Sequence, residues 1–450
     1  MKKGRRWRDA ITVYAEPRVF SLLFFGFSSG LPLALTASTL ATWLADVGVS
    51  LTTIGLFAAV GAPYSLKFLW APVIDRVRLP GLSRLLGHRR AWLVAVQCAL
   101  ILAIIGLGAT DPRNGPMLTA LFALLVSFLS ASQDVVIDAY RVEILDPDQY
   151  AAGAATTVFG YRIGMLVSGA GALFLADRMP WLTVFLVMAA VQAVGLVTTL
   201  VRPEPPARGG ETLAAEEAAA TRLLGAPATR DALHRAMAWI YVAAIAPFRE
   251  FLIRNGAATA AVILAFVVFY KFGDALAGTM TNPFLLKIGF TKSEIAEVVK
   301  LFGFVATLVG LALGGGLIRV MGLFRALLLC GILQLASNLM FAVQAVIGAD
   351  IGFLAVTIAF ENLAGGMGSA VFVAYISSLC NLAFTATQYA LLSSLAVVGR
   401  TLLSTGGGAV AEAVGWVQFF ALTALAAVPG LILLFVLNRM GLGVRAEARA

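Results

Sequence analysis

The stretch Ala131-Ser132-Gln133-Asp134-Val135-Val136-Ile137-Asp138-Ala139-Tyr140-Arg141 decides the fold, because it places charges at the end of an apolar run that starts near Met117. Spacings of four and seven residues put Asp134, Asp138 and Arg141 on one helix face. An ionised side chain deep in a membrane helix costs about 2.5–3.5 kcal/mol, so such residues usually face a protein interior or a wet cavity. The stretch therefore predicts a membrane helix that lines a polar path. The alternative is that these side chains only snorkel to water at the cytoplasmic end.

The composition supports a membrane protein with many spans. The chain has 450 residues, of which 60% are hydrophobic and 13% are charged, and its mean hydropathy is +0.91. A soluble domain has about 25% charged residues. A net charge of +9 would suggest a nucleic-acid partner in a soluble protein. In a membrane protein, basic residues collect in the loops on one side, so no nucleic-acid partner is predicted.

The residues that carry metal and redox chemistry are few. The three cysteines lie inside apolar runs without a pairing spacing, and the two histidines lie outside the spans. The sequence therefore predicts no disulfide framework, no metal site and no cofactor. It also shows no nucleophile–base pattern that would indicate an enzyme.

Apolar runs of about 20 residues indicate membrane helices. The sequence predicts twelve such spans, near 19–44, 51–74, 91–110, 116–140, 151–176, 181–201, 257–286, 294–318, 324–347, 351–379, 387–411 and 416–438. The first run is too long for a signal peptide, and we interpret it as a retained span. Arginine and lysine gather at the amino terminus and after even-numbered spans, which predicts that both termini are cytoplasmic.

The two halves of the chain repeat each other. Asp148-Gln149-Tyr150-Ala151 opens the fifth span, and Thr387-Gln388-Tyr389-Ala390 opens the eleventh. Each span continues to a glycine and an arginine inside the apolar run, at Gly160-Tyr161-Arg162 and at Gly399-Arg400. Six spans, a long loop and six more spans are typical of the major facilitator fold, an all-α fold of two six-helix bundles. The predicted domains are residues 1–201, a cytoplasmic linker with an interfacial helix at 202–256, and residues 257–450.

Charged residues inside the predicted spans distinguish helices that face lipid from helices that line a cavity. The third, sixth, ninth and twelfth spans carry none away from their ends, which predicts that they face lipid. The other spans carry Lys67, Asp134, Arg162, Lys271, Asp274, Lys300, Glu361 and Arg400. We expect these charges to line a cavity and to pair across helices, for instance Asp134 with Arg162 and Glu361 with Arg400. Glycines spaced four apart, such as Gly26 with Gly30 and Gly310 with Gly314, predict close helix packing.

Six stretches are distinctive: Ser28–Leu33, Lys67–Pro72, Gln133-Asp134 with Asp138–Arg141, Tyr270–Ala275, Phe360–Leu363 with Gly365–Gly368, and Ala386–Ser393. Together they resemble the AmpG-type muropeptide permeases. The Gln133-Asp134 element is also similar to acetyl-coenzyme A transporters of the same superfamily, whereas Glu361-Asn362 and Gly365–Gly368 favour the permeases. The resemblance implies a location in the bacterial inner membrane, and we expect a monomer. It implies proton-driven import of N-acetylglucosaminyl-1,6-anhydro-N-acetylmuramyl peptides for peptidoglycan recycling, a process that induces β-lactamase in some species.

The resemblance and the charges together predict the site. No phosphate-binding loop is present, so transport would be secondary. The candidate proton carriers are Asp134, Asp274 and Glu361. The candidate cargo-binding residues are Gln133, Tyr161, Arg162, Lys271, Asn362, Gln388 and Arg400, because cations suit peptide carboxylates and amides suit sugar hydroxyls. The expected gating residues at the cytoplasmic end are Lys67, Asp75, Arg76, Asp138 and Arg141.

Three other functions remain open from the sequence. The first is a transporter of the same fold with another anionic cargo, such as acetyl-coenzyme A, or a drug. The second is a receptor that binds muropeptide without moving it. The third, an intramembrane enzyme, has no supporting residues.

Overall fold

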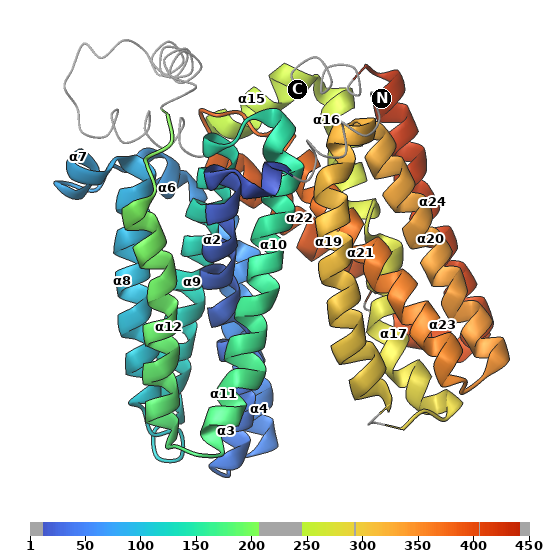
Figure 1. Ribbon diagram of the computed structural model, residues 1–450, viewed down its shortest axis with the longest axis horizontal. Helices are drawn as coiled ribbons and strands as arrows, with labels where there is room; N and C mark the ends of the chain where they lie inside the picture. Colours follow the sequence, from blue (N-terminus) through green and yellow to red (C-terminus); the bar gives the residue numbers. More distant parts are fainter. Residues whose placement is uncertain (1–11, 207–244, 292–293, 405, 442–450) are drawn as a thin grey trace.

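Every regular element in the described part of the chain is helical (Figure 1). The computed structural model describes residues 12–206, 245–291, 294–404 and 406–441. The first half contains η1 (Val13–Ala15), α2 (Pro17–Ala34), η2 (Leu35–Thr39), α3 (Leu40–Asp46), α4 (Leu51–Leu56), η3 (Phe57–Gly61), α5 (Ala62–Leu66), η4 (Lys67–Leu69), α6 (Ala71–Arg76), α7 (Leu82–Leu86), α8 (His88–Gly108), α9 (Pro116–Ile144), η5 (Pro147–Gln149), α10 (Tyr150–Leu166), η6 (Val167–Gly171), α11 (Ala172–Ala176) and α12 (Trp181–Val201). The second half contains α15 (Ala246–Asn255), α16 (Ala257–Phe269), α17 (Phe272–Ile288), η8 (Ile295–Phe302), α19 (Gly303–Met321), α20 (Leu323–Ile347), α21 (Ile351–Leu379), α22 (Thr385–Ser404), α23 (Gly407–Val414) and α24 (Trp416–Arg439).

Ten helical segments among the described residues are long and apolar enough to cross a membrane. The other two predicted spans, 51–74 and 387–411, are interrupted. Prolines at Pro63 and Pro72 remove backbone donors, so the first of these regions consists of consecutive short helices from α4 to α6. Glycines after Ser404 separate α22 from α23 in the second. The sequence pattern predicted the apolar length of these regions but not their breaks.

The helices form two groups that stand side by side (Figure 1). α12 packs on α8 in the first group, and α20 packs on α24 in the second. A buried apolar cluster surrounds Phe185 in the first half, and another surrounds Phe266 in the second half and also includes Val142 of α9. The outer face of α12 exposes Val197, Leu200 and Val201, as expected of a lipid-facing helix. Residues 207–244, which include most of the predicted linker, lie outside the described residues, so the domain limits stay a prediction.

Glycines allow two helix pairs to approach backbone to backbone. α2 and α10 meet where Gly26, Gly30, Gly160 and Gly164 each face a carbonyl oxygen of the partner helix. α19 and α21 meet in the same way at Gly310, Gly314 and Gly366. A side-chain carbon at any of these glycines would overlap the facing backbone, so the close packing predicted for them is observed. At Gly365, in contrast, an added side-chain carbon would meet nothing within 4 Å.

We expect Gly160→Ala to prevent stable assembly of α2 with α10. The added methyl group would overlap the carbonyl oxygen of Leu23, and a backbone atom cannot rotate away as a side chain can. The expected result is a loss of most of the monodisperse protein in size-exclusion chromatography after detergent extraction. Gly171→Ala is the matched control, because a methyl group there meets nothing within 4 Å. Equal yields of the two variants would contradict the packing argument.

Candidate functional site

One end of the molecule collects the basic loops. The start of α2, the short helix α7, α15 and the end of α24 lie together at this end (Figure 1). Its basic residues include Arg76, Arg78, Arg84, Arg89, Arg90, Arg202, Arg249, Arg254, Arg319 and Arg439. We call it the basic end, and we call the end with α3, α11 and α23 the opposite end.

Asp134 lies inside the first group of helices, on α9. Its carboxylate accepts a hydrogen bond from the Ser29 hydroxyl of α2. The charge of Lys67 and the Tyr64 and Tyr161 rings lie close enough to Asp134 to interact with it electrostatically. Asp134 is half-buried rather than sealed, so the carboxylate has a hydrogen-bond partner and access to its surroundings. These are the properties that a proton carrier in a membrane needs.

Gln133, next to Asp134, belongs to a different environment. It is fully buried, and its amide nitrogen donates to the Ser28 carbonyl at 3.0 Å. Its amide oxygen accepts from the Ser28 hydroxyl and from Gln192, each at 3.1 Å. This network ties α9 to α2 and α12. The placement argues against direct contact of Gln133 with a cargo and for a role in holding Asp134 in position.

The second half contributes its own polar group around Lys271 at the start of α17. The ammonium of Lys271 donates to the Ser369 hydroxyl at 3.0 Å and to the Gly365 carbonyl at 3.2 Å, and it lies 3.9 Å from Asp274. The absence of a side chain at Gly365 therefore leaves its carbonyl accessible to this ammonium and does not serve close helix packing. The structure brings together Lys271 and Asp274, two of the residues predicted from the sequence.

Glu361 and Asn362 of α21 complete this group. The Asn362 amide donates to Glu361 at 2.8 Å and to the Ile358 carbonyl at 3.0 Å, while its oxygen accepts from Thr307 at 2.8 Å. Glu361 is close enough to Asp274 and Lys271 for the three charges to interact. Two carboxylates and one ammonium thus share a small region of the second half, so the protonation of one affects the others.

The expected pairing of Asp134 with Arg162 is wrong. In the described part of the chain Asp134 pairs with Ser29 instead, and Arg162 is exposed on α10 beside Tyr161. An exposed arginine near the middle of a membrane helix is tolerated where the helix lines a water-filled space. The side chains of Arg400 and Lys300 lie outside the described residues, so the pairing expected for Glu361 with Arg400 stays a prediction.

Asp75 joins the two halves at the basic end. It lies at the end of α6 and accepts hydrogen bonds from the backbone N–H groups of Ala386 and Thr387 at 3.1 and 2.7 Å, and from the Thr387 hydroxyl at 2.6 Å. These groups form the first turn of α22, whose free N–H groups and dipole favour a negative charge. Arg89 then bridges Asp75 and Glu143, with distances of 2.7 Å to each carboxylate. A side chain of one half therefore caps a helix of the other.

A second set of contacts lies beside the first. Asp138 accepts from Arg141 at 3.1 Å and lies 3.6 Å from Lys67. Arg141, only 1% exposed, also donates to Ser377 of α21 at 3.2 Å and covers the ring of Tyr389. The predicted gating residues Lys67, Asp75, Asp138 and Arg141 thus meet at the basic end, and Arg76 lies half-buried next to Asp75.

Further contacts between the halves lie at the same end. Arg319 donates to the Asp148 carboxylate at 2.8 Å, and the Tyr14 hydroxyl donates to the Ala312 carbonyl at 2.6 Å. These hydrogen bonds and ion pairs between the two halves lie at the basic end, and the two groups of helices diverge toward the opposite end (Figure 1). The structure is therefore closed at the basic end.

Removal of the Asp75 carboxylate should open this end. We expect Asp75→Ala to raise the alkylation rate of Cys380 at least tenfold in a Cys98→Ser background, because three hydrogen bonds between the halves are lost. Cys380 is a suitable reporter because it follows α21 at the basic end, where burial raises the pKa of its thiol and slows its reaction. Asp111→Ala, at the opposite end, is the control. An unchanged rate in Asp75→Ala would show that the cap does not hold the halves together.

Gln388 lies away from both polar groups. Its amide donates to the Pro247 carbonyl at 2.9 Å and to Glu250 at 2.7 Å, and its oxygen accepts from the Asn381 backbone at 2.7 Å. The residue is 2% exposed and its hydrogen-bonding groups are occupied, which argues against the predicted role in cargo binding. The structure instead assigns Gln388 to the attachment of α15 to α22.

Sequence reasoning missed several members of the site. Ser29 and Ser369 hydrogen-bond the central charges, and Glu143 balances Arg89. Serines are common in membrane helices, so they gave no signal by themselves. Glu143 gave one, since it is a further charge two residues beyond the stretch Ala131–Arg141, although it lies on the other side of the helix from Asp134.

Comparisons with known proteins add an independent line of evidence. The family model described as acetyl-coenzyme A transporter 1 matches residues 18–114. The chain is 41% identical over 428 residues to the anhydromuropeptide permease of Escherichia coli, covering 95% of this chain and 81% of that protein. It is 36% identical to the putative transporter AmpG 4 of Rickettsia felis, covering 95% of this chain and 98% of the relative.

Solved structures support the architecture. The proton:xylose symporter XylE of the major facilitator superfamily, bound to a bromo-deoxyglucose, superimposes with a TM-score of 0.65 at 12% identity, covering 95% of this chain and 96% of that one. A double-tryptophan mutant of XylE gives a TM-score of 0.66 at 11% identity, covering 93% and 94% of the two chains. At this identity the likeness concerns the fold alone, and it confirms the predicted major facilitator fold.

Proposed function

This chain belongs to the AmpG family of anhydromuropeptide permeases, and from this membership we propose that it is a proton-coupled secondary transporter of anhydro-muropeptides. Its cargo would be N-acetylglucosaminyl-1,6-anhydro-N-acetylmuramyl peptides, imported from the periplasm to the cytoplasm for peptidoglycan recycling. The observation that carries the proposal is the 41% identity to the Escherichia coli permease across 95% of the chain. In species with the corresponding regulator, the imported cargo would lead to induction of β-lactamase.

The central residues suit such a cargo. Muropeptides carry peptide carboxylates, sugar hydroxyls and acetamido groups. Arg162 and Lys271 offer cations to the carboxylates, while Tyr161 and Asn362 offer ring stacking and hydrogen bonds to the sugars. The Lys271 ammonium is held by Ser369 and Asp274, so its position is fixed before the cargo arrives. Arg400 is proposed as a further cation from its sequence position alone.

Coupling of proton uptake to cargo movement would depend on the central carboxylates and on the contacts at the basic end. The carboxylates Asp134, Glu361 and Asp274 are the proposed proton sites, one in the first half and two in the second. A proton taken up by Glu361 or Asp274 reduces the attraction on Lys271, which becomes available to a cargo carboxylate. The contacts of Asp75, Arg141 and Arg319 at the basic end must break before the cargo can leave there. Alternating access would then be a rocking of the two halves about the central site.

The charge distribution supports an orientation. We place the basic end in the cytoplasm, because basic loops are retained on that side of the inner membrane. The described conformation is then closed to the cytoplasm. We further propose a monomer without catalytic activity, with residues 1–201 and 257–450 as its two bundles and residues 202–256 as a cytoplasmic linker.

A second function is favoured by one observation. The family model that matches residues 18–114 is named for an acetyl-coenzyme A transporter, and this region contains the helices α2 to α8. Acetyl-coenzyme A is also anionic, so the cations of the site suit it as well. The match covers a small part of the chain, whereas the similarity to the permeases runs through both halves.

Uptake into proteoliposomes tests the proposal. The probe is a labelled disaccharide–anhydro-muropeptide, offered with and without an inward proton gradient. We expect accumulation that depends on the gradient and that excess acetyl-coenzyme A does not reduce. Accumulation that acetyl-coenzyme A abolishes would favour the second function. Specific binding without accumulation in sealed vesicles would identify a receptor instead.

A further inference from the structure

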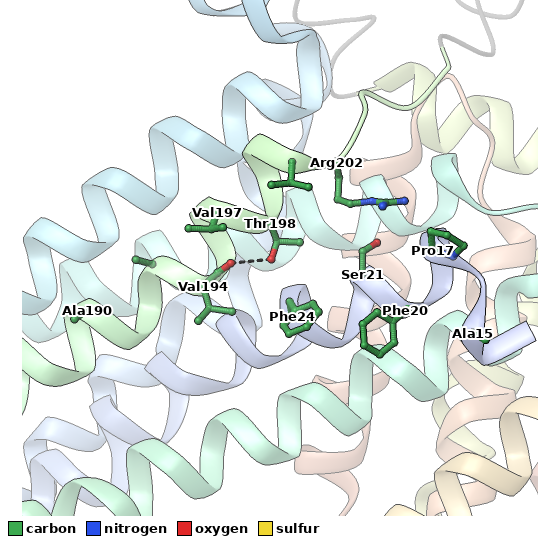
Figure 2. Close-up of a pocket in the computed structure, with 12 residues that line it drawn as sticks. Ala15, Pro17, Phe20, Ser21, Phe24, Ala190, Val194, Val197, Thr198 and Arg202 are labelled. Atoms are coloured by element: carbon green, nitrogen blue, oxygen red, sulfur yellow. Dashed lines mark hydrogen bonds between the residues drawn. The ribbon is translucent and has the colours of Figure 1, made fainter.

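An apolar groove runs along the outer surface of the first half, between α2 and α12 (Figure 2). Its cavity volume is about 650 Å³. Phe20 and Phe24 of α2 form one wall, and Val194 and Val197 of α12 form the other. These phenylalanines and Val197 are exposed to the surroundings of the protein. The groove therefore belongs to the surface that faces lipid and is separate from the central polar groups.

The length of the groove matches the thickness of the hydrocarbon layer of one leaflet. It extends along α12 from Ala190 to Val201, which at 1.5 Å per residue is about 16 Å. The hydrocarbon core of a bilayer is about 30 Å thick, so half of it is about 15 Å. The groove begins at the basic end, where α2 starts at Pro17, and it ends near the middle of the membrane. Apolar concave surface at this depth is filled by lipid chains, because water is absent there.

A cation lies at the mouth of the groove. Arg202 follows the last residue of α12, and its guanidinium extends across the groove toward Ser21 and Pro17 (Figure 2). The backbone N–H of Arg202 donates to the Thr198 carbonyl at 3.0 Å, but its guanidinium makes no hydrogen bond or ion pair within the part of the chain that the structure describes. The neighbouring arginines are engaged: Arg90 donates to the Thr199 and Leu200 carbonyls, each at 2.9 Å, and Arg18 lies 3.8 Å from Asp146. Arg202 alone among these three is left to an external anion.

We propose that this groove binds one anionic phospholipid of the leaflet at the basic end. One acyl chain lies between the phenylalanines of α2 and the valines of α12, and the headgroup phosphate pairs with Arg202. The guanidinium offers several donors in the geometry that phosphate oxygens accept. The depth, the apolar walls and the unpaired cation fit a lipid better than a soluble anion, which would use only the mouth. The bound lipid would fill the space between the first and sixth membrane helices without touching the cargo site.

Native mass spectrometry of the purified transporter tests this proposal without any transport assay. The probes are dioleoyl phosphatidylglycerol and dioleoyl phosphatidylcholine, added in equal amounts. We expect the protein to retain one phosphatidylglycerol in preference to phosphatidylcholine. Arg202→Gln should lower this preference about fivefold, the effect of one basic side chain at an anionic surface. Ala193→Trp, which fills the groove, should remove the retained lipid whatever its headgroup.

Two control variants distinguish the site from general membrane affinity. Arg439→Gln removes an exposed arginine at the end of α24, the helix that corresponds to α12 in the second half. Leu425→Trp adds an indole to an exposed position outside the groove. Both controls should retain the lipid as the unmodified protein does. Equal losses in Arg202→Gln and Arg439→Gln, or retention in Ala193→Trp, would overturn the proposal. Displacement of the lipid by glycerol 3-phosphate alone would show a site for soluble anions instead.

Discussion

Asp134→Asn should abolish muropeptide accumulation driven by a proton gradient, while exchange of labelled for unlabelled cargo continues. The amide still offers an oxygen to the Ser29 hydroxyl, so the local structure is kept. It carries no titratable proton, so a gradient can no longer be converted into cargo movement. We expect accumulation to fall to the level of passive leak, a loss of at least tenfold, in proteoliposomes with an imposed gradient.

The same measurement on Glu361→Gln tests whether the second half also contains a proton site. Asp111→Asn is the control, because Asp111 lies in the loop between α8 and α9. There the Asn114 amide donates to it at 2.6 Å, and this hydrogen bond lowers the pKa of the carboxyl group. That carboxylate stays ionised during transport, and its loss should leave accumulation unchanged. Full gradient-driven uptake in both Asp134→Asn and Glu361→Gln would refute the assignment of the proton to either residue.

Arg89→Leu should destabilise the protein strongly. Arg89 is 5% exposed, and it bridges the carboxylates of Asp75 and Glu143. Removing the shared cation leaves buried negative charge without its partner, which typically costs about 3–5 kcal/mol. We expect a loss of this size in the free energy of unfolding measured in mixed micelles.

A double substitution tests whether the charge bridge is the cause. In Arg89→Leu combined with Glu143→Leu, no carboxylate is left on Glu143, so part of the lost stability should return. Asp75 keeps its hydrogen bonds from Ala386 and Thr387 in both variants. Arg84→Leu, on the exposed surface of α7, should change stability by no more than about 0.5 kcal/mol. If Arg89→Leu resembles Arg84→Leu, the bridge contributes little to stability.

The sequence predicted the helices and the central charges for one reason. A charged residue inside an apolar run has few tolerable environments, so Asp134, Lys271 and Glu361 were recognised without any knowledge of their neighbours. The polar face of α9 followed from helical spacing alone. The broken regions at 51–74 and 387–411 were not predicted, because hydropathy measures apolar length and is insensitive to the helix breaks at proline and glycine.

The contact partners of these residues could not be predicted from the sequence. Ser29 lies 105 positions from Asp134, and Asp75 lies 312 positions from Thr387. Complementary charge suggested Arg162 for Asp134, but the folded chain supplies a hydroxyl instead. The cap on α22 by Asp75 was also hidden, because its donors are backbone groups that every residue has. Charge predicted which residues form the polar groups inside the helices, and only the tertiary structure determined what they contact.

The glycine contacts between α2 and α10 set an order for membrane insertion. Gly160 follows Gly26 by 134 positions, so at a synthesis rate of about 5–20 residues per second the first helix leaves the ribosome roughly 7–27 s before its partner helix is complete. During this interval the glycine face of α2 is not packed against α10, and the hydroxyls of Ser28 and Ser29 have no hydrogen-bond partner on another helix. The insertion machinery must therefore shelter the first helix until the fifth arrives, and a pause in translation between them would prolong the time in which proteases can recognise it.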